Sequence, residues 1–105
     1  MIGHTRCGAI RGAIDNAQLG NLTALLSRIR PAGESTLADG RPQGAADGKF
    51  VEAVAKANVL LAMRQIREQS PVIRELLESK IEAEQVALVG GMYNLMTGKV
   101  TFYED

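Results

Sequence analysis

Apolar side chains recur at intervals of three and four residues along much of the chain, the spacing that places them on one face of an α-helix. This pattern predicts a short helix over residues 8–17 and a second helix over residues 22–29. A longer helix is expected over residues 50–66, and Ser70-Pro71 offers an N-cap and a first-turn proline for a fourth. The fourth helix is predicted to bury four aliphatic residues: Val72, Ile73, Leu76 and Leu77.

Short apolar segments near the two ends of the chain predict strands. Residues 1–2 run directly into a glycine and are expected to end a buried strand. Residues 86–89 form a continuous apolar run, which is typical of a strand covered on both faces. Residues 97–98 (Thr-Gly) predict a turn into an alternating edge strand over residues 99–103. This order of elements indicates an α/β fold from which a leading strand and its crossover are missing.

Residues 31–48 contain two prolines, four glycines and few large apolar groups, so a loop is expected there. A chain of 105 residues suffices for a single domain with one core. Lysine plus arginine and aspartate plus glutamate each total 12, so no net charge attracts nucleic acid or an anionic membrane. One cysteine forms no internal disulfide, and no signal peptide or bilayer-spanning run is evident. We therefore expect a soluble, cytoplasmic protein.

The only histidine and the only cysteine lie three positions apart, within Gly-His-Thr-Arg-Cys-Gly at residues 3–8. Imidazole and thiolate are both zinc ligands, and the flanking glycines allow a tight turn around an ion. A zinc site takes three or four protein ligands, so His4 and Cys7 amount to half of one. The alternative is a buried cysteine that packs as a small apolar group beside a histidine bonded to the backbone.

Residues 3–10 resemble the second zinc-ligand segment of the β-class carbonic anhydrases. Residues 57–59 and 70–73 are similar to a helical stretch of that family, and residues 89–100 resemble its closing Gly-x-x-Tyr-Asp/Asn hairpin with Thr-Gly. The three segments occur in the family's order, and together they resemble the C-terminal half of such an enzyme. The resemblance implies a partial β-carbonic-anhydrase-like fold: helices packed on a small, mostly parallel sheet that ends in an antiparallel hairpin strand.

The resemblance also implies zinc as the cofactor and the reversible hydration of carbon dioxide to bicarbonate as the family activity. In the family, one histidine and two cysteines hold zinc, which lowers the pKa of a bound water so that hydroxide can attack carbon dioxide. His4 and Cys7 match two of these ligands. The backbone N–H of Gly8 matches the group that holds the substrate oxygen, so Gly8 is expected to bind substrate.

The family's other cysteine and an Asp-Arg pair lie in a Cys-x-Asp-x-Arg segment, and this chain contains no such segment. The active site is therefore expected to be incomplete, no catalytic residue is assigned, and the chain alone is expected to be inactive. Whether it is an enzyme stays open. The segment is expected to come from the missing half of a truncated protein or from a complementing chain.

Two other interpretations remain open. The chain is alternatively a non-catalytic homo-oligomeric module, in which two copies share a closed structural zinc site made of two histidines and two cysteines. It is otherwise a small domain without metal. Asp15 is a candidate to approach the metal and Arg6 a candidate anion anchor, although solvent exposure is expected of both. Tyr93 and Asn94 are assigned to packing of the hairpin.

Overall fold

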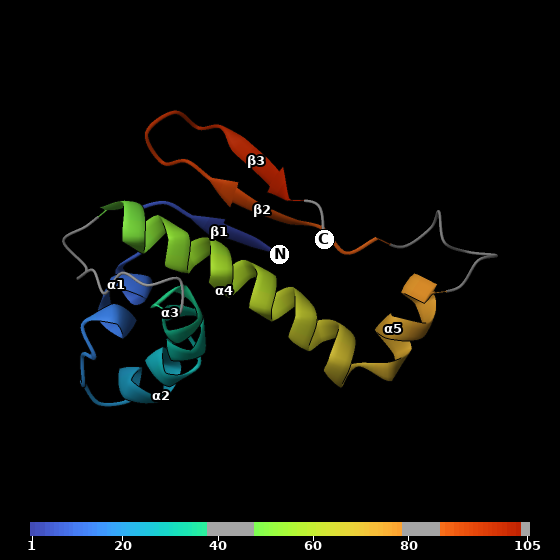
Figure 1. Cartoon of the computed structure of the whole chain (residues 1–105), viewed down its shortest axis with the longest axis horizontal. Helices are drawn as coiled ribbons and strands as arrows, with labels where there is room; N and C mark the ends of the chain where they lie inside the picture. Colours follow the sequence, from blue (N-terminus) through green and yellow to red (C-terminus); the bar gives the residue numbers. More distant parts are fainter. Residues whose placement is uncertain (38–47, 79–86, 104–105) are drawn as a thin grey trace.

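A small sheet and one long helix that crosses its face organise the fold (Figure 1). The computed structural model describes residues 1–37, 48–78 and 87–103. Within these residues, helices pack on a small mixed sheet whose first two strands are parallel and joined through helices, so the predicted α/β class is confirmed. In chain order the elements are β1 (Ile2–His4), α1 (Gly8–Ile14), α2 (Leu22–Ser27), α3 (Arg30–Leu37), α4 (Gly48–Gln69), α5 (Pro71–Glu78), β2 (Gly90–Tyr93) and β3 (Val100–Tyr103).

The sheet has the strand order β1–β2–β3. β1 runs parallel to β2, with Ile2 opposite Gly91 and His4 opposite Tyr93. β2 and β3 pair in the antiparallel direction. The first residues thus form a strand, as predicted, but the prediction that this strand is buried is wrong. Among the described strands β1 pairs with β2 alone, and Ile2 on this edge is 58% exposed.

The central strand begins later than the apolar run predicts. Val86 lies outside the described residues, residues 87–89 form no strand, and β2 starts at Gly90. Val89 joins the ladder only through its carbonyl, which accepts a hydrogen bond of 2.9 Å from the N-terminal amine of Met1. The prediction of a strand over residues 86–89 is therefore wrong, because the strand lies further toward the C-terminus and starts at Gly90.

Glycine occupies the start of β2 because α4 lies directly against it. A Cβ atom at Gly90 would overlap the Met63 sulfur and lie 3.0 Å from Val59 Cγ1. A Cβ atom at Gly3 on β1 would lie 2.9 Å from Val59 Cγ2. Larger side chains at these two positions would hold α4 away from the sheet. Glycine is therefore required at both positions because the helix approaches the strands closely, and not because the strands need apolar side chains there.

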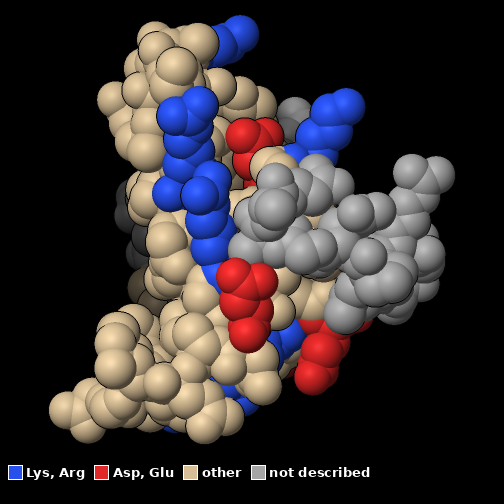
Figure 2. Space-filling view, turned by 90° about the vertical axis from the view of Figure 1, so that its left-hand side faces the viewer, with Lys and Arg blue, Asp and Glu red and all other residues tan. Residues whose placement is uncertain are grey.

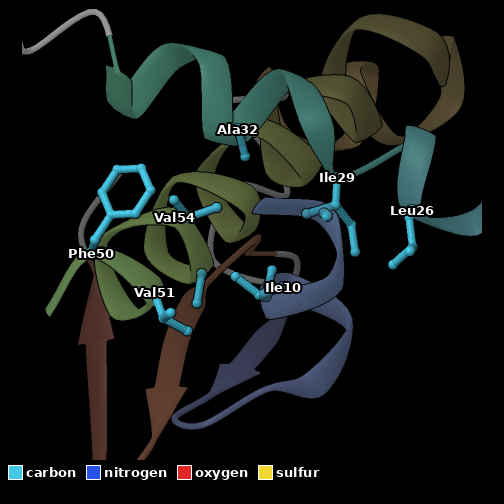
Figure 3. Packing of buried hydrophobic residues seen from close by; sticks show 9 residues of the cluster. Ile10, Leu26, Ile29, Ala32, Phe50, Val51 and Val54 are labelled. Atoms are coloured by element: carbon cyan, nitrogen blue, oxygen red, sulfur yellow. The ribbon is translucent and has the colours of Figure 1, made fainter. Parts of the chain in front are cut away.

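The core lies between α4 and the layer made by α1, α2 and α3 (Figure 3). Val51 and Val54 of α4 are 1% and 0% exposed, and each buried aliphatic side chain of this size contributes roughly 1.5–3 kcal/mol. The helix predicted over residues 50–66 is confirmed, with three further residues at its C-terminal end. The core cluster comprises Ile10, Ala13, Leu26, Ile29, Ala32, Phe50, Val51, Val54 and Ala55.

The loop predicted over residues 31–48 is wrong for residues 31–37, which belong to α3. Pro31 is the second residue of α3, where a missing N–H costs nothing because the first turn has no intrahelical acceptor for it. Ala32 is 1% exposed, so this helix is held by packing rather than by an apolar pattern of its own. Residues 38–47 of the predicted loop lie outside the described residues, and Gly48 begins α4.

α5 begins where predicted, since the Ser70 hydroxyl accepts a hydrogen bond of 3.3 Å from the Ile73 backbone N–H. Its predicted buried face is wrong: no residue of α5 is buried, and Val72 is 67% exposed. Among the described elements α5 contacts only α4, at whose far end it lies (Figure 1). The described part of the chain contains no helix that is both long and apolar enough to cross a membrane.

The predicted turn at residues 97–98 and the strand after it are confirmed. Gly98 has a φ of +73°, a conformation that a residue without Cβ adopts freely. The Asn94 side-chain oxygen accepts hydrogen bonds from the backbone N–H groups of Met96, at 2.8 Å, and Thr97, at 3.2 Å. The hairpin role predicted for Asn94 is thereby confirmed.

We predict that Gly90→Ala destabilises the chain by about 1–3 kcal/mol, because the added methyl forces Met63 and Val59 away from the sheet. Urea unfolding followed by circular dichroism measures the effect. Gly33→Ala, in the middle of α3 where a Cβ meets nothing within 4 Å, is the matched control and should stabilise by about 1 kcal/mol or less. Equal stability of the two variants would contradict the close approach of α4.

Candidate functional site

The loop that carries His4 and Cys7 leaves the carboxyl end of β1 and enters α1. Arg6 has a φ of +55°, which turns the chain sharply, and Cys7 is the extended N-cap residue of α1. In parallel α/β sheets, ligands bind at the carboxyl ends of the strands, which is where this loop lies. The two candidate zinc ligands therefore share one short turn at a position suited to a site.

Thr5 anchors this loop to the hairpin, and it was not singled out from the sequence. It is the buried polar residue of the described core, at 7% exposure. Its backbone N–H donates to the Tyr93 carbonyl at 3.0 Å, and its hydroxyl accepts from the Leu95 N–H at 3.0 Å. Only the backbone of Tyr93 takes part in this contact, and the packing role predicted for its side chain stays a prediction. The sequence signal that could have identified Thr5 is its position, as a small polar residue between the two candidate zinc ligands.

The His4 ring is positioned by a hydrogen bond between Nδ1 and the Thr5 carbonyl oxygen, at 2.8 Å. A carbonyl oxygen only accepts, so Nδ1 carries the proton in the neutral ring and Nε2 keeps its lone pair. Histidines that bind metals usually donate their other ring N–H to a carbonyl or carboxylate in this way. His4 is an exposed residue. His4 has the orientation and tautomer of a ligand.

Cys7 is a half-buried free thiol that packs against the core cluster. This placement agrees with either a structural or a metal-binding thiol, so both interpretations stay open. Gly8 is exposed and begins α1, and a Cβ at this position would meet nothing within 4 Å. The substrate-binding role expected of Gly8 stays a prediction.

The other two candidates lie in solvent. Asp15 follows the last residue of α1 and is exposed; at 1.5 Å per residue it lies about 12 Å along the helix from Cys7. The structure does not bring its carboxylate to the loop. Arg6 is exposed on the loop itself. Figure 2 shows basic and acidic side chains on the same face, in agreement with the balance of 12 and 12.

The donors present do not complete a zinc site. The chain contains one histidine and one cysteine, and residues 1–37, 48–78 and 87–103 hold no group of three or more His, Cys, Asp or Glu side chains placed to bind one ion. His4 and Cys7 are two of the three or four protein ligands that zinc takes. A zinc site at this loop would need at least one donor besides these two.

Comparison with known proteins identifies the class of protein. A family model described as carbonic anhydrase matches residues 1–100. The crystal structure of the β-carbonic anhydrase CafA of the fungal pathogen Aspergillus fumigatus is similar, with a TM-score of 0.81 and 24% identity; the match covers 98% of this chain and 46% of CafA. The β-carbonic anhydrase CcaA has a TM-score of 0.78 and 19% identity, with 98% and 45% covered.

The chain belongs to the β-carbonic anhydrase family. It spans less than half the length of the two similar structures, so the fold seen here is a partial one. At these identities the structural likeness shows the fold alone. The search of curated proteins gave no match.

We predict that Thr5→Val lowers stability by about 1–3 kcal/mol, because the Leu95 N–H then loses its buried acceptor. Thermal unfolding by calorimetry measures this loss. Thr101→Val, an exposed position on β3, is the matched control and should leave stability nearly unchanged. If both substitutions had the same small effect, Thr5 would not be the anchor of the loop.

Proposed function

We propose that this chain supplies His4 and Cys7 to the zinc site of a carbonic anhydrase and does not hydrate carbon dioxide by itself. The observation that carries the proposal is the His4 ring, whose Nδ1 is hydrogen-bonded to the Thr5 carbonyl so that Nε2 keeps its lone pair, in the same short turn as Cys7. Membership of the β-carbonic anhydrase family supports zinc as the metal and carbon dioxide and bicarbonate as the substrate pair. When bound, the metal would supply an activated water.

In this proposal the residues of the loop bind and position; none of them is catalytic. His4 contributes a neutral imidazole, and Cys7 contributes a thiolate. The Gly8 N–H is proposed to hold a substrate oxygen, by its match to the family motif. What is missing is the second cysteine, as a zinc ligand, and the Asp-Arg pair, and a further polypeptide segment must bring them.

The structure also indicates which strand could receive that segment. β2 already has a neighbour on each side, so among the described strands the open edges are those of β1 and β3. On β1, the Met1 carbonyl and the Thr5 N–H bond to β2. Main-chain groups alternate along a strand, so those of Ile2 and His4 face the opposite, open edge. A strand paired there would lie directly beside the His4 loop.

We predict that the purified 105-residue chain gives carbon dioxide hydration no faster than buffer in stopped-flow measurements with zinc present. Adding a polypeptide that contains the Cys-x-Asp-x-Arg strand should restore measurable hydration and bring bound zinc to about one ion per chain. Cys7→Ser and His4→Asn should each abolish both the restored hydration and the zinc binding. Asp15→Asn, at an exposed carboxylate away from the loop, is the control and should retain them.

Elemental analysis separates the remaining alternatives. A zinc-to-chain ratio near one half in the absence of any added segment, lost in Cys7→Ser, would favour the shared site between two copies. No zinc under any condition would favour a domain without metal. Hydration by the chain alone that Cys7→Ser abolishes would contradict the proposal directly.

A further inference from the structure

Arg30 presents a buried pair of hydrogen-bond donors that the zinc-site proposal does not use. It is the first residue of α3, and the side chain is half-buried. Its Nε and Nη2 atoms are both buried, and neither has a hydrogen-bond partner. Ile29 and Ala32 on either side are 8% and 1% exposed, so the backbone that carries this side chain is fixed by the core.

The two unpaired atoms form one edge of the guanidinium. Nε–H and the N–H of Nη2 on the same side are parallel, and this fork matches the two oxygens of a carboxylate. A guanidinium stays charged at any physiological pH. Both N–H groups of this edge therefore remain hydrogen-bond donors that require an acceptor. A buried donor without a partner costs about 1–3 kcal/mol, and more when it is charged.

The arrangement favours a flat anion over other acceptors. A single carbonyl or water oxygen must be shared between the two donors, whereas two coplanar oxygens offer each donor an acceptor of its own. Glu34 lies one turn further along α3, at the spacing where an ion pair can form, but it is exposed and pairs with neither buried nitrogen. Within residues 1–37, 48–78 and 87–103, nothing therefore accepts a hydrogen bond from this edge.

We propose that Arg30 binds a small planar oxyanion of the carboxylate class through its Nε–Nη2 edge. Formate and bicarbonate share this chemistry, since each offers two coplanar oxygens on one carbon. Because the edge is buried, binding requires a local rearrangement of the side chains that cover it. A bound anion would stabilise α3 and, through its packing on α1, the helix that follows Cys7. This inference does not rest on zinc or on catalysis.

The test compares thermal unfolding in sodium formate, sodium bicarbonate and sodium chloride at equal ionic strength and pH. In the wild-type chain, formate at about four times its Kd should raise Tm by about 5 °C over chloride, and the rise should saturate. Arg30→Met should abolish the rise, and so should Arg30→Lys, which keeps the charge without the fork. Arg28→Met, at an exposed arginine two residues earlier, is the control and should retain it.

A response to formate and bicarbonate alike supports the carboxylate class, and a response to bicarbonate alone narrows the ligand to bicarbonate. If neither formate nor bicarbonate raises Tm over chloride, the proposal is overturned. It is also overturned if Tm rises in Arg30→Met as much as in the wild-type chain. Glu34→Gln must also keep the formate response, because its loss would mean that Glu34 forms part of the site instead. If the Arg30 variants fail to fold, the Nε–H NMR signal of Arg30 in the wild-type chain decides: it must shift saturably with formate and not with chloride.

Discussion

The direct contact between α4 and the sheet is the constraint on which the rest of the fold depends. α4 is buried on two sides: Val51 and Val54 face the helices α1–α3, while Val59 and Met63 lie on β1 and β2. The second contact is possible only because Gly3 and Gly90 have no side chain. Lys56 adds a contact at the rim of the sheet, with Nζ 4.9 Å from the centre of the Tyr103 ring. One helix thus links every layer of the described chain.

This packing places the candidate site. Gly3 is held under Val59, and the next residue along the strand is His4, whose Nδ1 is bonded to the Thr5 carbonyl. The Thr5 hydroxyl in turn receives the Leu95 N–H from the hairpin. Hydrogen bonds within the loop and to the hairpin therefore hold it in place. The two donors can be placed by folding alone, while completion of a zinc site is a separate requirement.

The parts of the fold predicted correctly are those that local physical rules decide. The repeat of apolar residues in α4, the serine cap of α5 and the turn at Gly98 each depend on residues close in sequence. The errors arise where tertiary contact overrides the local pattern. α3 forms despite two breaking residues, Pro31 and Gly33, because Ala32 packs in the core. β2 begins at a glycine because α4 lies against it, and no strand propensity reports that contact.

The candidate site also contains features that local sequence decides and features that tertiary contacts decide. His4 and Cys7 could be identified from the sequence because their spacing and flanking glycines are local features. The importance of Thr5 could not, since its partner Leu95 is 90 residues away. The exposed faces of β1 and α5 were also unpredictable, because an apolar pattern indicates that a face is suited to burial and does not say whether another element covers it. On β1 the open edge adjoins the loop that carries the two candidate zinc ligands, so the place where the sheet can be extended lies beside the candidate metal site.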